Sequence, residues 1–257
     1  MKDVLRAVAV AFSMYSALPM PKAEWNENNL RYAVAFLPLV GAVAALALYG
    51  LDALLRLIAA GPLLYAALLT VAPLLITGGI HMDGFCDTLD ALSAHAEPER
   101  ARAILKDPRA GAFAAVGSPA LLLLQAGAWA ELSSHAAALP LALLGFVFSR
   151  AFAAIAVLVF PKASETGLAA RFSAPAPKKR LAGVLWALAA LLFAGATLVY
   201  GIPGALAPLL AAALLFYLRR MSEKRFGGLT GDLAGFYICI CETLWLLAVA
   251  VSAGALR

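Results

Sequence analysis

The chain of 257 residues is 63% hydrophobic and only 14% charged, and its mean hydropathy is +0.88. Soluble globular proteins are about half apolar and about a quarter charged, so this composition excludes an ordinary soluble domain. The formal net charge of +5 comes from basic residues scattered between apolar runs, which indicates topology signals beside a lipid bilayer and no groove for nucleic acid. The composition therefore predicts an all-α, polytopic helical membrane protein with a single domain over residues 1–257.

The apolar runs predict the elements in chain order. Residues 1–30 are expected to form an N-terminal interfacial segment, because the uncharged run 7–21 is too short to span a bilayer comfortably and contains Pro19 and Pro21. Longer runs, near the roughly 20 residues that cross a bilayer core, predict seven transmembrane helices. They lie near 32–51, 57–78, 111–130, 136–160, 181–200, 203–218 and 233–254.

The basic residues predict the orientation of these spans. With seven spans, seventeen of the twenty Lys and Arg residues fall on one side, in segments 1–31, 79–110, 161–180 and 219–232. Only Arg56 and Arg257 fall on the other side, and Arg150 lies within a span. Because positive residues concentrate on the cytoplasmic side, the N-terminus is predicted to be cytoplasmic and the C-terminus external.

The most informative segment follows the second span and reads GGIHMDGFCDTLD over residues 78–90. At about 100° per residue, Asp83, Asp87 and Asp90 fall on one stripe of a helix. Such like charges repel unless a cation lies between them, and Mg²⁺ accepts oxygen ligands while keeping waters and substrate phosphates. Gly84 leaves room for a backbone or a phosphate, and His81 could be a general base, a phosphate donor or an interfacial side chain. The alternative is a solvated acidic face just outside the membrane.

A basic segment precedes the third span. Arg102, Lys106 and Arg109 lie where cations oppose the dipole of the following helix. Either an anionic substrate or anionic lipid headgroups would explain them.

A glycine-rich segment precedes the seventh span. Gly228, Thr230 and Gly231 could offer backbone N–H groups and a hydroxyl to a phosphate, and Asp232 could add a fourth carboxylate to the metal site. The alternative is a glycine-rich turn with Asp232 as the N-cap of the last helix.

Two ionisable residues, Arg150 and Glu242, lie inside predicted spans, where charge is costly. At about 1.5 Å per residue, both lie roughly 15 Å below the cytoplasmic surface. We therefore predict an ion pair that supports the bundle or forms the floor of a polar cavity.

Taken together, three segments resemble the cobalamin synthase family, the adenosylcobinamide-GDP ribazoletransferases of the late cobalamin pathway. Residues 78–91 resemble the family's GGxHxDGxxDxxDA pattern, 104–113 its KDPRxGxF segment and 228–232 its TGD turn. The resemblance covers nearly the whole chain. Two positions depart from the pattern, because Cys86 stands where Ala is usual and Leu233 where Thr is common.

The resemblance implies an enzyme that transfers a substituted phosphate group. A hydroxyl-side group of α-ribazole, or of α-ribazole 5′-phosphate, would attack adenosylcobinamide-GDP and release GMP, giving adenosylcobalamin or its 5′-phosphate. The resemblance further implies a bacterial or archaeal cytoplasmic (inner) membrane, with the active site facing the cytoplasm, and leaves a homodimer open.

The same resemblance implies roles for the polar residues. Mg²⁺ would be held by Asp83, Asp87, Asp90 and Asp232, and Lys106 and Arg109 would neutralise phosphate charge. His81, or a carboxylate free of metal, would take the proton of the attacking hydroxyl. The catalytic set is His81, Asp83, Asp87, Lys106 and Arg109, and the substrate-binding set is Gly84, Arg102, Arg150, Gly228, Thr230 and Gly231.

Two alternatives remain open on the sequence. A CDP-alcohol phosphotransferase of phospholipid synthesis also carries an Asp-Gly-rich stripe, although its Ala-Arg pair after the first Asp-Gly is absent here. An ion-coupled transporter would use the acidic cluster together with Arg150 and Glu242, and would need the carboxylates at the membrane midplane.

Overall fold

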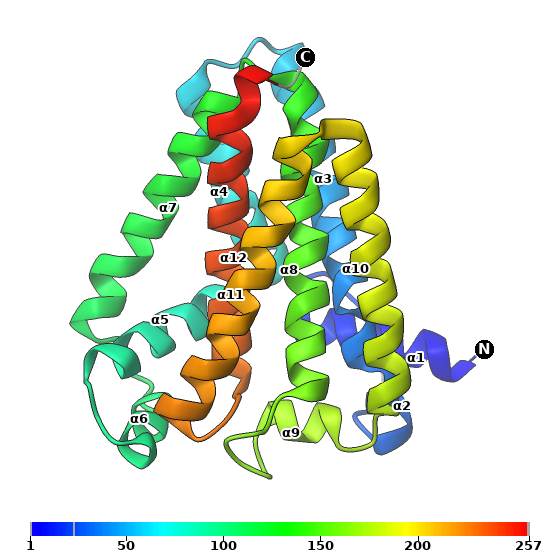
Figure 1. The fold of residues 1–257 in the computed structure, drawn as a ribbon, viewed down its shortest axis with the longest axis vertical. Helices are drawn as coiled ribbons and strands as arrows, with labels where there is room; N and C mark the ends of the chain where they lie inside the picture. The colour runs from blue at the N-terminus through cyan, green and yellow to red at the C-terminus, as the bar shows by residue number, and fades with distance from the viewer. Residues whose placement is uncertain (1, 23, 256–257) are drawn as a thin grey trace.

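The computed structural model describes residues 2–22 and 24–255, and within these ranges the chain forms helices and no β-strand (Figure 1). Six helical segments are long and apolar enough to cross a membrane, and a bent helix pair adds a seventh candidate. The all-α polytopic fold is therefore confirmed. The membrane-crossing helices are α3 (Leu37–Leu57), α4 (Pro62–Thr77), α7 (Ala112–Leu132), α8 (Leu139–Val159), α10 (Lys178–Tyr200), α11 (Ile202–Phe226) and α12 (Gly231–Ser252).

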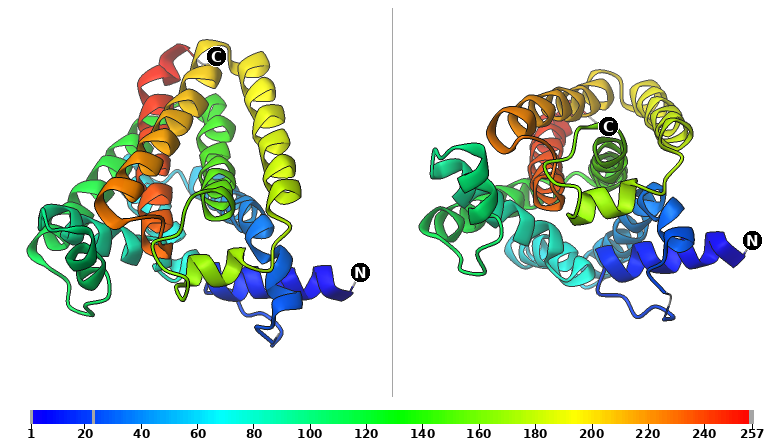
Figure 2. Two further views of the ribbon diagram at one scale, coloured as in Figure 1. Left: turned by 60° about the horizontal axis from the view of Figure 1, so that its bottom comes forward. Right: turned by 90° about the horizontal axis from the view of Figure 1, so that it is seen from below.

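Helix α8 lies at the centre of the bundle, where α3, α10, α11 and α12 pack around it (Figures 1 and 2). Close approach of α12 depends on Gly145, because a Cβ at this position would lie 2.7 Å from the indole ring of Trp245. The Trp245 Nε1–H donates to the Leu141 carbonyl at 2.8 Å, which satisfies the buried polar atom of this large side chain. The core is thus a helix surrounded by helices.

Several predicted boundaries were wrong. Helix α3 continues to Leu57 instead of ending near residue 51, because the Asp52 carboxylate accepts bonds from Arg56 Nε and the Tyr65 hydroxyl, both at 2.7 Å. Because Arg56 and Tyr65 pair with the Asp52 carboxylate, its negative charge is compatible with continuation of the apolar helix. Helix α4 accordingly begins at Pro62 and not at residue 57, and α11 continues past its apolar part to Phe226.

The second span is short and then turns sharply. Gly78 and Gly79 adopt left-handed conformations with φ of 65° and 77°, which glycine reaches without steric cost. Helix α5 (Ile80–Ser93) follows at an angle of 94° to α4 and leaves the membrane-crossing part of the bundle. The predicted glycine break is confirmed, and the acidic stripe lies on a helix that runs across the end of the bundle (Figure 1).

The short helices gather at this same end of the molecule (Figures 1 and 2). They are α1 (Lys2–Tyr15), α2 (Glu27–Ala33), α6 (Pro98–Ile104) and α9 (Leu168–Ser173). Helix α1 lies across the end of the bundle and is anchored there, because the Ala17 N–H donates to the Ile76 carbonyl at 2.8 Å. The four segments rich in Lys and Arg therefore meet at one end, as the threading predicted, whereas Arg56 contacts Ser133 at the other.

Candidate functional site

Helix α5 lies directly against the start of α12. A Cβ at Gly84 would lie 2.8 Å from the Asp232 carbonyl oxygen, and one at Gly235 would lie 3.1 Å from the His81 carbonyl oxygen. Each glycine faces the backbone of the other helix, and larger side chains at these positions would prevent this approach. The contact brings Asp83, on α5, beside Asp232, on α12, although the two residues are far apart in sequence.

The carboxylates of this region affect one another. The pKa of Asp87 is raised to about 6, first by burial and then by the negative charges of Asp83, Asp232 and Asp90. Like charges that share a site disfavour ionisation unless a cation compensates them. The predicted convergence of the acidic stripe with Asp232 is therefore present in the folded chain.

The Asp90 carboxylate is bonded to the backbone at the start of α7. Its carboxylate accepts N–H bonds from Gly111 at 2.7 Å, Phe113 at 3.1 Å and Ala114 at 3.0 Å. These are orphan donors at the start of α7, which a negative charge satisfies well. Gly111 is needed there, because a Cβ would lie 2.5 Å from a carboxylate oxygen. Asp90 thus positions α7 against α5.

Two adjoining cavities open beside Asp232. The first, which we term the basic cavity, has a volume of about 520 Å³, and Arg102, Lys106, Ser164 and Thr166 contribute to its lining. The second, which we term the apolar cavity, has a volume of about 200 Å³. Its lining includes Met14, Tyr15, Ile80, His81, Asp83 and Ile238. The cavities share Leu168, Ala169, Gly231 and Asp232 as a common wall.

The predicted basic group is divided between two places. Lys106 and Arg102 line the basic cavity, whereas Arg109 lines a separate cavity of about 410 Å³ together with Asp87 and Asp90. Arg109 also forms an exposed two-point ion pair with Asp107, whose pKa falls to about 2 because it accepts these hydrogen bonds. Lys106 and Arg109 therefore face different cavities, since the turn between them separates their side chains.

The glycine-rich segment has a more structural role than predicted. The Gly228 N–H donates to the Ser222 carbonyl at 3.0 Å, and a Cβ there would lie 2.5 Å from the Ala163 nitrogen. Thr230 is the N-cap of α12, because its hydroxyl accepts the Leu233 N–H at 3.2 Å. The alternative that made Asp232 the N-cap is wrong, since Asp232 lies one residue inside the helix.

His81 is buried, with 6% of its surface exposed, and its Nε2 atom has no hydrogen-bond partner in the described structure. Its ring stacks on Tyr15 of α1, with centroids 6.3 Å apart and planes 24° apart. Buried polar atoms without a partner are uncommon in native proteins, and they point to a functional role or to a missing ligand. This burial does not favour the interpretation of His81 as an interfacial side chain, and its role as a general base stays a prediction.

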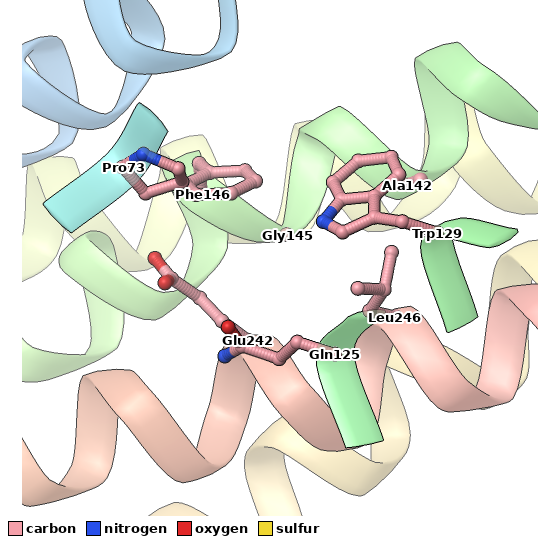
Figure 3. Close-up of a pocket in the computed structure, with 8 residues that line it drawn as sticks. All are labelled: Pro73, Gln125, Trp129, Ala142, Gly145, Phe146, Glu242 and Leu246. Carbon is pink, nitrogen blue, oxygen red and sulfur yellow. The ribbon is translucent and has the colours of Figure 1, made fainter. Parts of the chain in front are cut away.

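Arg150 and Glu242 form the predicted ion pair within the bundle. Arg150 is 1% exposed, and it lines neither the basic nor the apolar cavity among the described residues. Figure 3 shows Glu242 beside Gln125 in a small pocket of about 20 Å³, which has room for about one water molecule. The pair fits the predicted structural support, and the proposed substrate contact of Arg150 stays a prediction.

The carboxylates of this region fit a metal ion only in an open site with few protein ligands. Within the described ranges, no group of three or more His, Cys, Asp or Glu side chains is close enough to form a complete ligand cage. Mg²⁺ does not require one, because it commonly binds one or two carboxylates together with waters and substrate phosphates. Asp83 and Asp232 on one wall, with Asp87 nearby, fit this open mode of binding.

Sequence reasoning missed two parts of the lining. Met14 and Tyr15 come from an N-terminal helix that was expected only to lie on the membrane, and Ser164 and Thr166 come from a segment without a recognised motif. Tyr15, at the end of the amphipathic helix α1, was the one sequence signal that α1 lines a cavity, and it did not indicate which element α1 would contact.

Comparison with known proteins agrees with the geometry. Residues 7–250 match the family model described as cobalamin-5-phosphate synthase. A relative from Lachnoclostridium phytofermentans, named adenosylcobinamide-GDP ribazoletransferase, is 38% identical over 98% of this chain and 96% of its own length. One of the same name from Pseudomonas paraeruginosa is 34% identical over 98% of this chain and 100% of its own length. No solved structure matches. The chain belongs to the cobalamin-5-phosphate synthase family.

Proposed function

We propose that the protein is an adenosylcobinamide-GDP ribazoletransferase of cobalamin synthesis. The observation that carries this proposal is the contact of α5 with α12, which places Asp83 and Asp232 together beside a cavity lined by Arg102 and Lys106. A displacement reaction at a pyrophosphate requires carboxylates that bind a metal ion and, next to them, cationic side chains that bind the phosphate groups. The family match and the relatives' names support the same reaction.

In the proposed reaction, a ribose hydroxyl of α-ribazole attacks the phosphorus atom that is bonded to the cobinamide side. A new P–O bond forms, the P–O bond to the guanosine monophosphate group breaks, and GMP leaves with the bridging oxygen. The family description names a 5-phosphate product, so the attacking oxygen is a ribose hydroxyl other than the one at the 5′ position. The hydroxyl proton passes to His81 or to a carboxylate that does not bind metal.

The residues have distinct parts in this proposal. Asp83 and Asp232 would hold Mg²⁺, which would supply stabilisation of charge on the attacking and leaving oxygens, and Asp87 lies nearby. Arg102 and Lys106 bind the diphosphate in the basic cavity. Asp90 contributes indirectly by positioning α7, because both of its carboxylate oxygens already accept N–H bonds at the start of that helix.

The charge pattern supports a cytoplasmic (inner) membrane location, with these cavities facing the cytoplasm. The cavities open at the end of the bundle where the Lys- and Arg-rich segments meet, and such segments stay on the cytoplasmic side. The homodimer that the resemblance leaves open stays a prediction. The 94° turn keeps the carboxylates away from the midplane, which disfavours an ion-coupled transporter.

The test uses the full-length protein in lipid nanodiscs. It is expected to release GMP from adenosylcobinamide-GDP only when α-ribazole or its 5′-phosphate and Mg²⁺ are present. Asp83→Asn and Asp232→Asn are each expected to lower kcat by at least about 100-fold, which corresponds to about 2.7 kcal/mol of transition-state stabilisation.

The exposed Glu99 of α6 offers a matched control, and Glu99→Gln is expected to keep wild-type turnover. Full Mg²⁺-dependent turnover by Asp83→Asn would refute the metal assignment. Absence of GMP release by the wild-type protein would refute the proposed activity itself.

A further inference from the structure

The apolar cavity has a composition that the transfer chemistry alone does not explain. We propose that it binds the aromatic base of α-ribazole, while the basic cavity binds the guanosine diphosphate part of the other substrate. This inference rests on the proposed function and assigns its two substrates to two cavities that share one wall.

Charge separates the two cavities. Asp83 and Asp232 line the apolar cavity, and no Lys or Arg is found among its described lining residues. A diphosphate placed there would find no cationic side chain to pair with, whereas an uncharged aromatic base requires none. Arg102 and Lys106 give the basic cavity the opposite preference. The phosphate-bearing substrate therefore fits the basic cavity.

Size points to the same assignment. The apolar cavity, at about 200 Å³, is smaller than the roughly 300–1,000 Å³ of pockets that enclose a drug-sized ligand. It has room for one fused ring system and not for a whole nucleotide or a corrinoid. The basic cavity, at about 520 Å³, accommodates a larger group.

The wall of the apolar cavity suits a flat ring. Tyr15 and His81 contribute two nearly parallel rings, and Phe172 supports Tyr15 with its centroid 6.0 Å away. Aromatic side chains of this kind provide a face on which a planar base stacks. The buried Nε2 of His81 has no hydrogen-bond partner among the described residues, and the unsubstituted ring nitrogen of a benzimidazole base would offer it one.

The shared wall then explains how the substrates meet. Gly231 and Asp232 line both cavities, so a ribose attached to a base in the apolar cavity reaches the same place as a diphosphate in the basic cavity. Asp83 lies on the ribose side of this wall. The two cavities are therefore arranged for an attacking hydroxyl and a phosphorus atom to approach each other.

The test measures binding of α-ribazole and of GDP separately, by calorimetry on the full-length protein in nanodiscs. Tyr15→Leu is expected to weaken α-ribazole binding by about tenfold and to leave GDP binding unchanged, whereas Lys106→Gln should do the reverse. Free 5,6-dimethylbenzimidazole is expected to compete with α-ribazole and not with GDP. Tyr15→Phe keeps the ring and is expected to bind α-ribazole like the wild type.

Tyr49 of α3 supplies the matched control, because it is 56% exposed and lies outside both cavities, so Tyr49→Leu should change neither affinity. Unchanged α-ribazole binding by Tyr15→Leu would overturn the inference, as would a selective loss of GDP binding, which would place guanine in the apolar cavity. In both cases the wild type would still release GMP, so the proposed function would survive. A wild-type protein that neither bound α-ribazole nor released GMP would refute the proposed function as well.

Discussion

The contact of α5 with α12 yields the sharpest prediction, which concerns Gly84→Ala. A Cβ at Gly84 would lie 2.8 Å from the Asp232 carbonyl oxygen and 2.9 Å from its Cα, whereas ordinary van der Waals contact begins at 3.4 Å. The overlap with the oxygen is thus 0.6 Å, the difference between 3.4 and 2.8 Å, and it involves backbone that cannot rotate away. The substitution must move α5 and α12 apart.

The expected cost follows from this overlap. Overpacking of a buried contact destabilises a protein by about 1–3 kcal/mol, so the Tm of the variant should fall by several degrees. A displacement of about 1 Å in an active site can cost about 100-fold in rate, so a shift of this smaller size is expected to lower kcat on the order of tenfold. The loss should appear in kcat, because Asp83 and Asp232 would be separated while Arg102 and Lys106 stay in place.

Thermal unfolding and steady-state GMP release in nanodiscs would measure both effects. Gly127→Ala is the matched control, because Gly127 lies within α7 and a Cβ there meets nothing within 4 Å. Since Ala is favoured over Gly in a helix by about 1 kcal/mol, this variant should be at least as stable as the wild type. If Gly84→Ala behaved like Gly127→Ala in both assays, the two helices would not be in the contact described.

Three further predictions concern stability. Arg150→Ala and Glu242→Ala are each expected to destabilise the protein by about 3–5 kcal/mol in denaturant unfolding, while replacement of both by Met and Leu should cost much less, because the single changes leave a buried charge unpaired. Burial, assisted by the charge of Lys178, lowers the pKa of Lys162 to about 8, so the folded protein holds this proton less tightly than the unfolded chain does. The Tm should therefore rise between pH 8 and the ordinary lysine pKa of about 10.5, and Lys162→Met should remove that rise. Asp90→Ala is expected to cost about 0.5–2 kcal/mol and to speed amide exchange at the start of α7, and unchanged exchange there would contradict the capping role.

The sequence by itself determined the class of fold and which loops lie at the same end of the bundle. Apolar runs of sufficient length must be helices in a bilayer, because every backbone polar group must be satisfied within the segment. The distribution of Lys and Arg then fixed which loops share a side, and the structure gathers those segments at one end of the bundle. The break at Gly78-Gly79 could also be predicted from the sequence, because two adjacent glycines readily adopt the left-handed conformations that other residues avoid.

The sequence was less informative where a residue's role depends on a partner far along the chain. The spacing of Asp83, Asp87 and Asp90 placed them on one stripe, yet it could not show that Asp90 is taken by the N–H groups of α7. Nor could it show that Asp232 reaches Asp83, since that contact depends on Gly84 and on the packing of α5 against α12.

The tertiary structure alone decided how the site is divided. Residues 106 and 109 are neighbours in sequence but face different cavities, and the N-terminal helix closes one side of the apolar cavity through Tyr15. The physical reason is that helical periodicity and hydropathy are local properties of the chain, whereas a cavity is enclosed by elements whose relative positions are set by packing. The acidic stripe thus predicted the chemistry, and the packing of α12 against α5 brings Asp232 beside Asp83.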